Sequence, residues 1–134
     1  MKVKEFMTTK IEYVDAGGSL YDAVEKMVDK RIRSLAVRFP GNEMDVGVIT
    51  ARDVVFKVLA RGLDPKDVKA GDIASRPVIC IDQDTDLSEA ARIMEESKVA
   101  RLFICDKDGI IGIVALLDVM WATLIKRARG NHVS

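Results

Sequence analysis

The sequence predicts an α+β protein built from two copies of one β-α-β-β-α unit. A shift of 67 positions lays the apolar pattern of the first half on that of the second, so that Leu20 falls on Leu87. After a loop that differs by two residues the shift becomes 65, and Gly47 falls on Gly112. A length difference confined to a loop is typical of a duplicated unit. The 134 residues, 49% apolar and 31% charged, are enough for one compact domain or for two small units that share a core.

Each copy is expected to contain five elements in the same order. In the first copy they are a strand over 11–14, a helix that begins at Leu20, strands over 35–39 and 46–49, and a helix from Arg52 to about Arg61. In the second copy they are a strand over 78–81, a helix that begins at Leu87, strands over 102–105 and 110–114, and a helix from Leu117 to about Arg127.

An apolar stripe and a capping residue predict the first helix of each copy. Apolar side chains recur at helical spacing and so lie on one helix face: Leu20, Ala23, Val24, Met27 and Val28, then Leu87, Ala90, Ala91 and Met94. A capping residue stands before each stripe, with a carboxylate three positions later: Ser19 before Asp22, and Asp86 before Glu89.

Turn residues predict the paired strands and the boundaries of the repeats. The second pair of strands is joined by Asp106-Lys107-Asp108-Gly109, a hairpin signal, and the first by a loop with Pro40-Gly41-Asn42. A copy of about 65 residues buries little surface alone, so we expect the two sheets to pack against each other about a pseudo-twofold axis. The expected boundaries are 1–61 for the first repeat, 62–69 for a linker, 70–127 for the second repeat and 128–134 for a polar tail.

Charge and composition exclude several classes of function. The 21 Lys and Arg residues balance 21 Asp and Glu residues, so the chain lacks the basic surplus typical of nucleic-acid and membrane-surface binding. We interpret the basic run 126–129 as a solvated helix end. The first ten residues lack the apolar stretch of a signal peptide, and no apolar run approaches the roughly 18 residues of a membrane span, which predicts a cytoplasmic protein. Cys80 and Cys105 lie in apolar runs and are expected to be reduced core thiols.

The chemistry of common enzymes is missing from the sequence. The single histidine, His132, lies in the polar tail, so a Ser-His-Asp or Cys-His arrangement lacks its base. No cluster has zinc or iron spacing, and neither glycine-rich phosphate loop is present. We therefore expect a protein that is not an enzyme and that needs no metal or obligatory cofactor.

The strand-to-helix junctions carry the polar residues that remain. In Gly47-Val48-Ile49-Thr50-Ala51-Arg52-Asp53, the Thr hydroxyl lies beside free N–H groups at a helix N-terminus, which favours phosphate. The carboxylate of Asp53 is suited to accept from two vicinal hydroxyls, as in ribose recognition, and Asp118 recurs in the second copy. An ordinary capping box explains the same residues without a ligand. These residues alone leave both interpretations open.

Several motifs at matching positions in both copies resemble a tandem pair of cystathionine β-synthase (CBS) domains, a Bateman module. The resemblance covers about residues 3 to 127 and rests on four sets of residues: the junctions that end in Asp53 and Asp118, the leading Phe6-Met7-Thr8, and the segments Ile32-Arg33-Ser34-Leu35 and Val99-Ala100-Arg101-Leu102. It implies a non-catalytic module that binds AMP, ADP, ATP, NAD or S-adenosylmethionine and regulates a partner protein.

The resemblance also implies two ligand sites, because the carboxylate of one repeat in this family faces the adenine pocket of the other. In the first site Asp53 holds the ribose, Thr50 the phosphate or ribose, and Val48 lies beneath the ribose. Arg101 matches a position that often binds phosphate. The walls of this site are Pro77, Val78, Ile79, Val99 and Ala100.

The second implied site is built on Asp118 and Ile113 and departs from the family pattern. Ala115 stands where Ser or Thr is expected and cannot donate a hydrogen bond, a loss of about 1 kcal/mol. Arg33 either offsets that loss or fills the cleft. The walls of this site are Lys10, Ile11, Glu12, Ile32, Arg33 and Ser34. Solvated cations explain Arg33 and Arg101 equally well.

Two functions follow from these readings. The first is a sensor whose ligand is AMP, ATP or another adenosine derivative, and the alternative is a dimeric protein-interaction module without nucleotide binding. In either case we expect a homodimer, because the closing helices carry apolar residues beyond one stripe. These residues are Val54, Val55, Val58 and Leu59 in the first copy, and Val119, Met120, Trp121 and Leu124 in the second.

Overall fold

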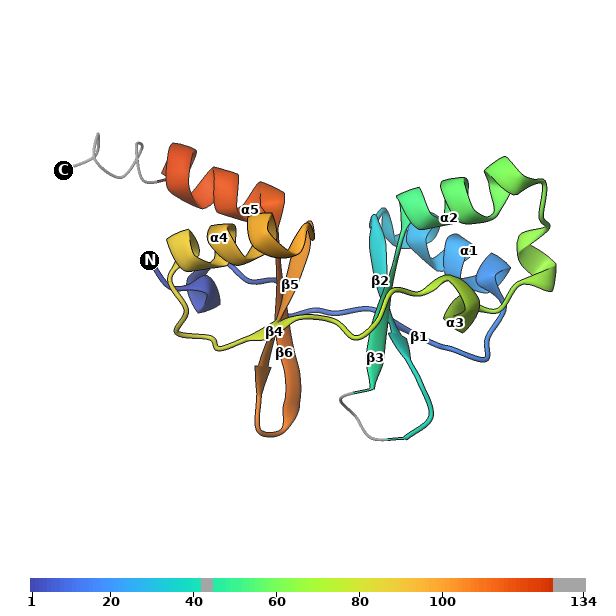
Figure 1. Ribbon diagram of the computed structural model, residues 1–134, viewed down its shortest axis with the longest axis horizontal. Helices are drawn as coiled ribbons and strands as arrows, with labels where there is room; N and C mark the ends of the chain where they lie inside the picture. The colour runs from blue at the N-terminus through green and yellow to red at the C-terminus, as the bar shows by residue number, and fades with distance from the viewer. Residues whose placement is uncertain (42–44, 127–134) are drawn as a thin grey trace. The chain divides into compact units, whose positions relative to one another are not determined.

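The computed structural model describes residues 1–41 and 45–126, and the chain forms two compact units (Figure 1). The first-repeat unit comprises Ile11–Val78. The second-repeat unit combines Met1–Lys10 with the chain from Ile79 onward. Each unit contains one three-stranded mixed sheet, as the predicted α+β class requires. Among the described residues, no helix has both the length and the apolar character needed to cross a lipid bilayer.

The sheet of the first-repeat unit has the order β1-β2-β3, with β1 parallel and β3 antiparallel to β2. The strands are β1 (Tyr13–Asp15), β2 (Ser34–Arg38) and β3 (Val46–Thr50). The helices are α1 (Leu20–Lys30), α2 (Ala51–Lys57), α3 (Ala70–Ile73), and 3-10 turns at Leu59–Arg61 and Pro65–Asp67. In Figure 1, α1 and α2 lie along one face of this sheet. The core between them includes Leu20, Met27, Leu35, Ile49 and Val58.

Local signals fix the ends of α1. The Ser19 hydroxyl accepts a hydrogen bond from the Tyr21 N–H at 3.1 Å, which confirms the predicted cap. The helix ends at Arg31, whose backbone is left-handed with φ 55°, a conformation in which a helix stops. Leu20, Ala23 and Met27 of the predicted stripe are buried, and Val24 packs against the same core. Val28 is 69% exposed, so its assignment to the stripe is wrong.

The second-repeat unit repeats this arrangement with the sheet order β4-β5-β6. Its strands are β4 (Cys80–Ile81), β5 (Arg101–Asp106) and β6 (Gly109–Ala115). Its helices are α4 (Leu87–Ser97), α5 (Leu116–Met120), a π-helical turn at Trp121–Lys126, and a 3-10 turn at Val3–Glu5. The core includes Val3, Leu87, Met94, Leu102 and Val114.

Asp86 does not cap α4 through its side chain, so this part of the prediction is wrong. The Asp86 carboxylate instead lies 3.6 Å from the Lys2 ammonium, and the first N–H of the helix, that of Leu87, donates to the Met1 carbonyl at 3.0 Å. The N-terminal segment therefore supplies an acceptor for the first N–H of the helix and an ion-pair partner for Asp86.

Each unit contains a segment that comes from outside its own repeat. Thr8 pairs with Ile113 through two backbone hydrogen bonds of 2.8 and 2.9 Å, in the second-repeat unit. At the equivalent place in the first-repeat unit, Ser75 pairs with Val48 through two bonds of 2.9 Å. Val3, at the start of the 3-10 turn that precedes β1, is fully buried in the core of the second-repeat unit.

The element boundaries differ from the predicted ones mainly at the edge strands and the closing helices. β1 and β4 begin two residues later than predicted. Ile11 and Val78 lie before the first residue of each strand that pairs with its neighbour. The helix predicted from Arg52 is broken at Val58 into α2 and a 3-10 turn. The predicted end of the last helix near Arg127, the polar tail with His132, and Asn42 lie outside the described residues.

The structure corrects the prediction of two reduced core thiols. Cys80 and Cys105 form a disulfide between β4 and β5, with Cα atoms 5.6 Å apart, a separation usual for this bond. Cys80 is exposed and Cys105 half-buried, so neither is a core residue. Their separation of 25 residues gave no sign that parallel pairing brings the two positions together.

Candidate functional site

The junction between β3 and α2 holds Thr50 and Asp53 in a reciprocal pair of hydrogen bonds. The Thr50 hydroxyl accepts from the Asp53 N–H at 3.1 Å, and Asp53 Oδ2 accepts from the Thr50 N–H at 2.9 Å. The other carboxylate oxygen, Oδ1, lies 3.3 Å from the Lys57 ammonium. Both residues are half-buried, so this arrangement is a capping box whose polar groups stay partly open to solvent.

The equivalent junction between β6 and α5 makes only half of this box. Asp118 Oδ2 accepts from the Ala115 N–H at 2.8 Å, but Ala115 has no hydroxyl to return the bond. The backbone is nearly the same in both junctions, with φ −115° and ψ 161° at Thr50, and φ −114° and ψ 169° at Ala115. The second junction therefore differs from the first mainly by one side-chain oxygen.

Strand pairing brings a second predicted group beside each junction. Ser34 is the register partner of Thr50, and the Ala51 N–H donates to the Arg33 carbonyl at 2.9 Å. In the other unit Arg101 is the register partner of Ala115. There the Leu116 N–H donates to the Ala100 carbonyl at 3.1 Å.

Each unit therefore gathers half of both implied sites. The first-repeat unit contains Val48, Thr50, Asp53, Pro77, Val78, Ile11, Glu12, Ile32, Arg33 and Ser34. The second-repeat unit contains Ile79, Val99, Ala100, Arg101, Lys10, Ile113 and Asp118. The pairing of a carboxylate from one repeat with walls from the other stays a prediction.

Some of the residues predicted as adenine walls lie just before the edge strands β1 and β4, whereas Ile32, Arg33, Val99 and Ala100 lie before the central strands β2 and β5. The Glu12 carbonyl accepts from the Ala36 N–H at 3.0 Å, and the Ile79 carbonyl accepts from the Phe103 N–H at 2.8 Å. These bonds are equivalent under the 67-residue shift. Pro77, which follows a cis peptide bond, is exposed, whereas Ile79 is half-buried and packs on the core of its unit.

Comparison with known proteins agrees with this repeated architecture. The family model for the CBS domain matches two segments of the chain, residues 3–60 and 70–124. The chain belongs to the CBS-domain family. The two matched segments make it a tandem CBS pair, as the resemblance of the sequence motifs implied.

Similar proteins come from several organisms. The tandem CBS pair is 43% identical to an uncharacterized protein of Methanopyrus kandleri, over 59% of this chain and 42% of that protein. It resembles the hexameric CBS-CP12 protein of bloom-forming cyanobacteria with a TM-score of 0.85 and 26% identity, over 95% of this chain and 74% of that one. It also resembles CBSX2 in complex with AMP, with a TM-score of 0.72 and 29% identity, over 92% of this chain and 96% of CBSX2. The chain spans about half the length of the first curated relatives it matches.

An ion cluster that the sequence analysis missed surrounds Glu12 of the CBS pair. The Glu12 carboxylate lies 3.5 Å from the Lys26 and Lys30 ammonium groups, which project from successive turns of α1. Desolvation opposes its ionisation, but the two lysines together hold the pKa of Glu12 below its usual value of 4.5. The helical spacing of the two lysines was visible in the sequence, but their partner across the unit was not. Within residues 1–41 and 45–126, no group of three or more His, Cys, Asp or Glu side chains is placed to hold a metal ion.

The exposed apolar side chains of the closing helices are partly different from the predicted ones. Val54 and Val58 are buried in the core, so their assignment to a second apolar face is wrong. The predicted residues that are exposed are Val55, Leu59, Met120, Trp121 and Leu124. Phe56, Leu116, Leu117 and Ile125 of the same helices are exposed as well, and so is Val28 on α1. Val119 is half-buried.

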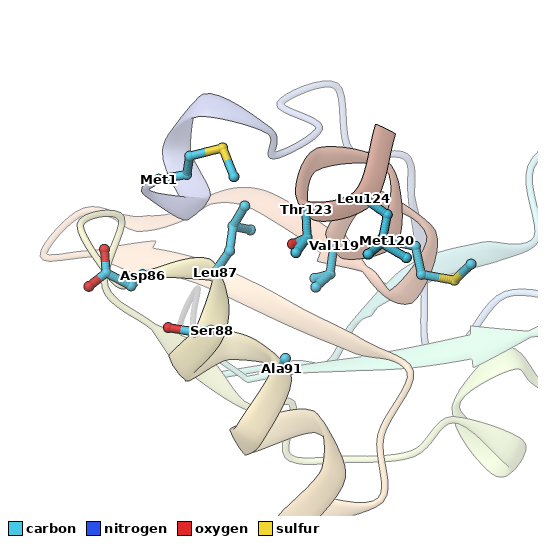
Figure 2. A pocket seen from close by; sticks show the side chains of 9 residues that line it. All are labelled: Met1, Asp86, Leu87, Ser88, Ala91, Val119, Met120, Thr123 and Leu124. Atoms are coloured by element: carbon cyan, nitrogen blue, oxygen red, sulfur yellow. The ribbon is translucent and has the colours of Figure 1, made fainter. Parts of the chain in front are cut away.

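Each unit has a pocket against its closing helix. In the first-repeat unit a pocket of about 310 Å³ is lined by Val24, Met27, Val28, Ile32, Ala51, Val54, Val55 and Leu59. In the second-repeat unit, Figure 2 shows side chains of α4 and α5 gathered with Met1 around a pocket of about 530 Å³. Its lining is mixed, because Asp86, Ser88 and Thr123 lie among apolar side chains.

Proposed function

We propose that this tandem CBS pair is a non-catalytic regulatory module that binds an adenosine-containing ligand, such as AMP, ADP, ATP, NAD or S-adenosylmethionine, and acts on a partner protein. The observation that carries the proposal is the half-buried junction of Thr50 and Asp53, where a hydroxyl and a carboxylate meet at a helix N-terminus. A complex of AMP with the similar protein CBSX2 supports the class of ligand.

The capping box leaves both side chains able to bind a ligand. A carboxylate offers about four lone-pair positions. Asp53 uses one for the Thr50 N–H and one toward Lys57, which leaves acceptors for two ribose hydroxyls. The Thr50 hydroxyl oxygen accepts from the Asp53 N–H, and its own proton remains available to donate to a phosphate oxygen. The cap and the ligand site are therefore compatible.

The proposal ranks the site of Thr50 and Asp53 above that of Asp118. At the second junction Ala115 offers no hydroxyl, which weakens binding there by about 1 kcal/mol, or several-fold in affinity. We assign Pro77, Val78, Ile79, Val99 and Ala100 to the walls of the stronger site. Arg101 is assigned to its phosphate.

Ligand titration of matched variants tests the proposal. A thermal-shift panel of AMP, ATP, NAD and S-adenosylmethionine identifies a ligand, because ligand at 100 times its Kd stabilises a protein by about 2.7 kcal/mol. Calorimetry is then expected to show a loss of about 1.5–3 kcal/mol, or ten- to a hundred-fold in affinity, for Asp53→Ala and a smaller loss for Asp118→Ala. Asp22→Ala, which removes a first-turn carboxylate from α1, is the control for helix stability.

Two results would contradict the proposal in different ways. Equal losses for the two variants, or a larger loss for Asp118→Ala, would show that the sites are ranked wrongly. No binding of any of the four compounds by the intact chain would favour the alternative, a dimeric interaction module.

We also propose that the chain forms a homodimer through the exposed apolar faces beside α2 and α5. Leu59 of the first-repeat unit is 52% exposed, and Trp121 and Leu124 of the second-repeat unit are 45% and 63% exposed. Exposed apolar surface of this kind is typical of interaction sites. The similar CBS-CP12 protein is a hexamer. Light scattering at micromolar concentration is expected to give twice the chain mass, and Leu124→Glu to give the mass of one chain. A monomer mass for the wild type would refute the dimer.

A further inference from the structure

The disulfide of Cys80 and Cys105 joins diagonal neighbours on one face of a sheet. Cys80 on β4 lies directly opposite Phe103 on β5, and Cys105 follows Phe103 by two residues. Side chains alternate between the two faces of a strand, so all three project from the same face. Ile79 and Ile81 pack on the core, on the opposite face. The disulfide therefore connects the two strands without entering the core.

The first-repeat unit has a different tie at the same place. Under the 67-residue shift, Cys80 corresponds to Tyr13 and Cys105 to Arg38. There the Arg38 guanidinium carbon lies 3.9 Å from the centre of the Tyr13 ring, a cation–π contact across the same pair of strands. Both units thus tie their edge strand to its neighbour diagonally, but only the second uses a bond that redox chemistry breaks.

The edge strand of the second-repeat unit is short and makes few hydrogen bonds to its neighbour. β4 is only two residues long, and just before it the Ile79 carbonyl accepts from the Phe103 N–H. A strand this short contributes few ladder bonds, and local opening begins where such bonds are few. The residues immediately before Cys80 are Pro77, Val78 and Ile79, which the proposed function assigns to the adenine walls.

We propose that the Cys80–Cys105 disulfide is a redox-sensitive clamp that holds the segment 77–81 in place and so tightens the nucleotide site to which that segment contributes. The effect of the clamp on nucleotide affinity rests on the proposed function, whereas the clamp itself does not. Oxidation fixes the segment, and reduction releases it.

The reaction partner of this clamp is a dithiol. A thiolate of the dithiol attacks the exposed Cys80 sulfur, the disulfide bond breaks, and Cys105 leaves as a thiolate. The second thiol of the reductant then attacks the reductant sulfur that is bonded to Cys80. This step closes the reductant's disulfide and releases the Cys80 thiolate. Two electrons pass from the dithiol, which becomes a disulfide, and the two cysteine thiolates take up two protons.

Hydrogen exchange of the intact chain, with and without dithiothreitol, tests the clamp. Reduction is expected to accelerate exchange of the Phe103 amide and of residues 78–82 by about tenfold or more, because a cross-link between the strands is lost. The equivalent segment 11–15 is the internal control, since Tyr13 and Arg38 do not respond to a reductant. Equal exchange in both redox states would overturn the clamp.

Titration with AMP in both redox states tests the effect on ligand. The oxidised chain is expected to bind AMP several-fold more tightly than the reduced chain. The double variant Cys80→Ser/Cys105→Ser is expected to match the reduced chain and to ignore the reductant. Equal affinity in both states would overturn the regulation while leaving the proposed function intact. Absence of AMP binding in either state would overturn the link to nucleotide, and the exchange experiment would still decide the clamp.

Discussion

The two strand-to-helix junctions differ mainly by one hydroxyl group, so comparing them isolates the contribution of that group to stability. The Thr50 hydroxyl satisfies the Asp53 N–H at 3.1 Å, whereas Ala115 leaves the Asp118 N–H without that acceptor. Loss of such a cap costs about 1 kcal/mol, within a range of about 0.5–2. We therefore expect Thr50→Ala to lower the free energy of unfolding by about 1 kcal/mol. We expect Ala115→Thr to raise it by about half as much or more, because the backbone at Ala115 already has the dihedral angles of Thr50.

Urea denaturation followed by circular dichroism measures both effects. With a slope of about 1–3 kcal/mol per molar, a change of about 1 kcal/mol moves the midpoint by roughly 0.3–1 M. Thr50→Ser is the control, because it keeps the hydroxyl and removes only the methyl group. An unchanged midpoint and slope for Thr50→Ala would refute the reasoning. So would a loss for Thr50→Ser as large as that for Thr50→Ala, which would assign the effect to packing.

Two further predictions concern a close backbone approach and the Glu12 cluster. Gly47→Ala is expected to destabilise the chain by about 1–3 kcal/mol, because a Cβ there would lie 2.9 Å from the Ser75 carbonyl oxygen. Gly112→Ala is expected to cost less in the same urea assay, because the three atoms nearest to the new Cβ all belong to the flexible Met7 side chain. The lowered pKa of Glu12 means that its ionised form stabilises the fold above pH 4.5 and that this contribution is lost as the pH falls below that value. The difference in unfolding free energy between wild type and Glu12→Gln is therefore expected to shrink on acidification, and a constant difference would contradict this.

The order of elements was predictable because apolar spacing and turn residues report on local structure. The stripe from Leu20 to Met27 and the hairpin at Asp106–Gly109 depend on neighbours in sequence, and both appear as predicted. The α3 helix was not predicted, because four residues carry too little periodicity to identify.

Features that depend on distant partners were not predictable in this way. The Asp86 carboxylate turns to Lys2, and Cys80 bonds to Cys105, because chain segments far apart in sequence meet in the fold. The same division between local and distant contacts applies to the candidate site. The junction of Thr50 and Asp53 is local and was identified, whereas the ion cluster of Glu12 with Lys26 and Lys30 joins residues from different elements and was missed.

The N-terminal segment gives the chain the topology of a domain insertion. Residues 11–78 form one unit, and they interrupt the other, whose first ten residues must find the strand around Ile113. During synthesis residues 11–78 are made before β6. Residues 1–10 therefore lack their pairing partner until β6 has been synthesised. The folded insert connects the two parts of the interrupted unit and acts as the loop between them. The free energy of closing such a loop rises by only about 0.6 kcal/mol when its length doubles. A deletion within residues 1–10 would therefore damage the unit that contains β4, β5 and β6.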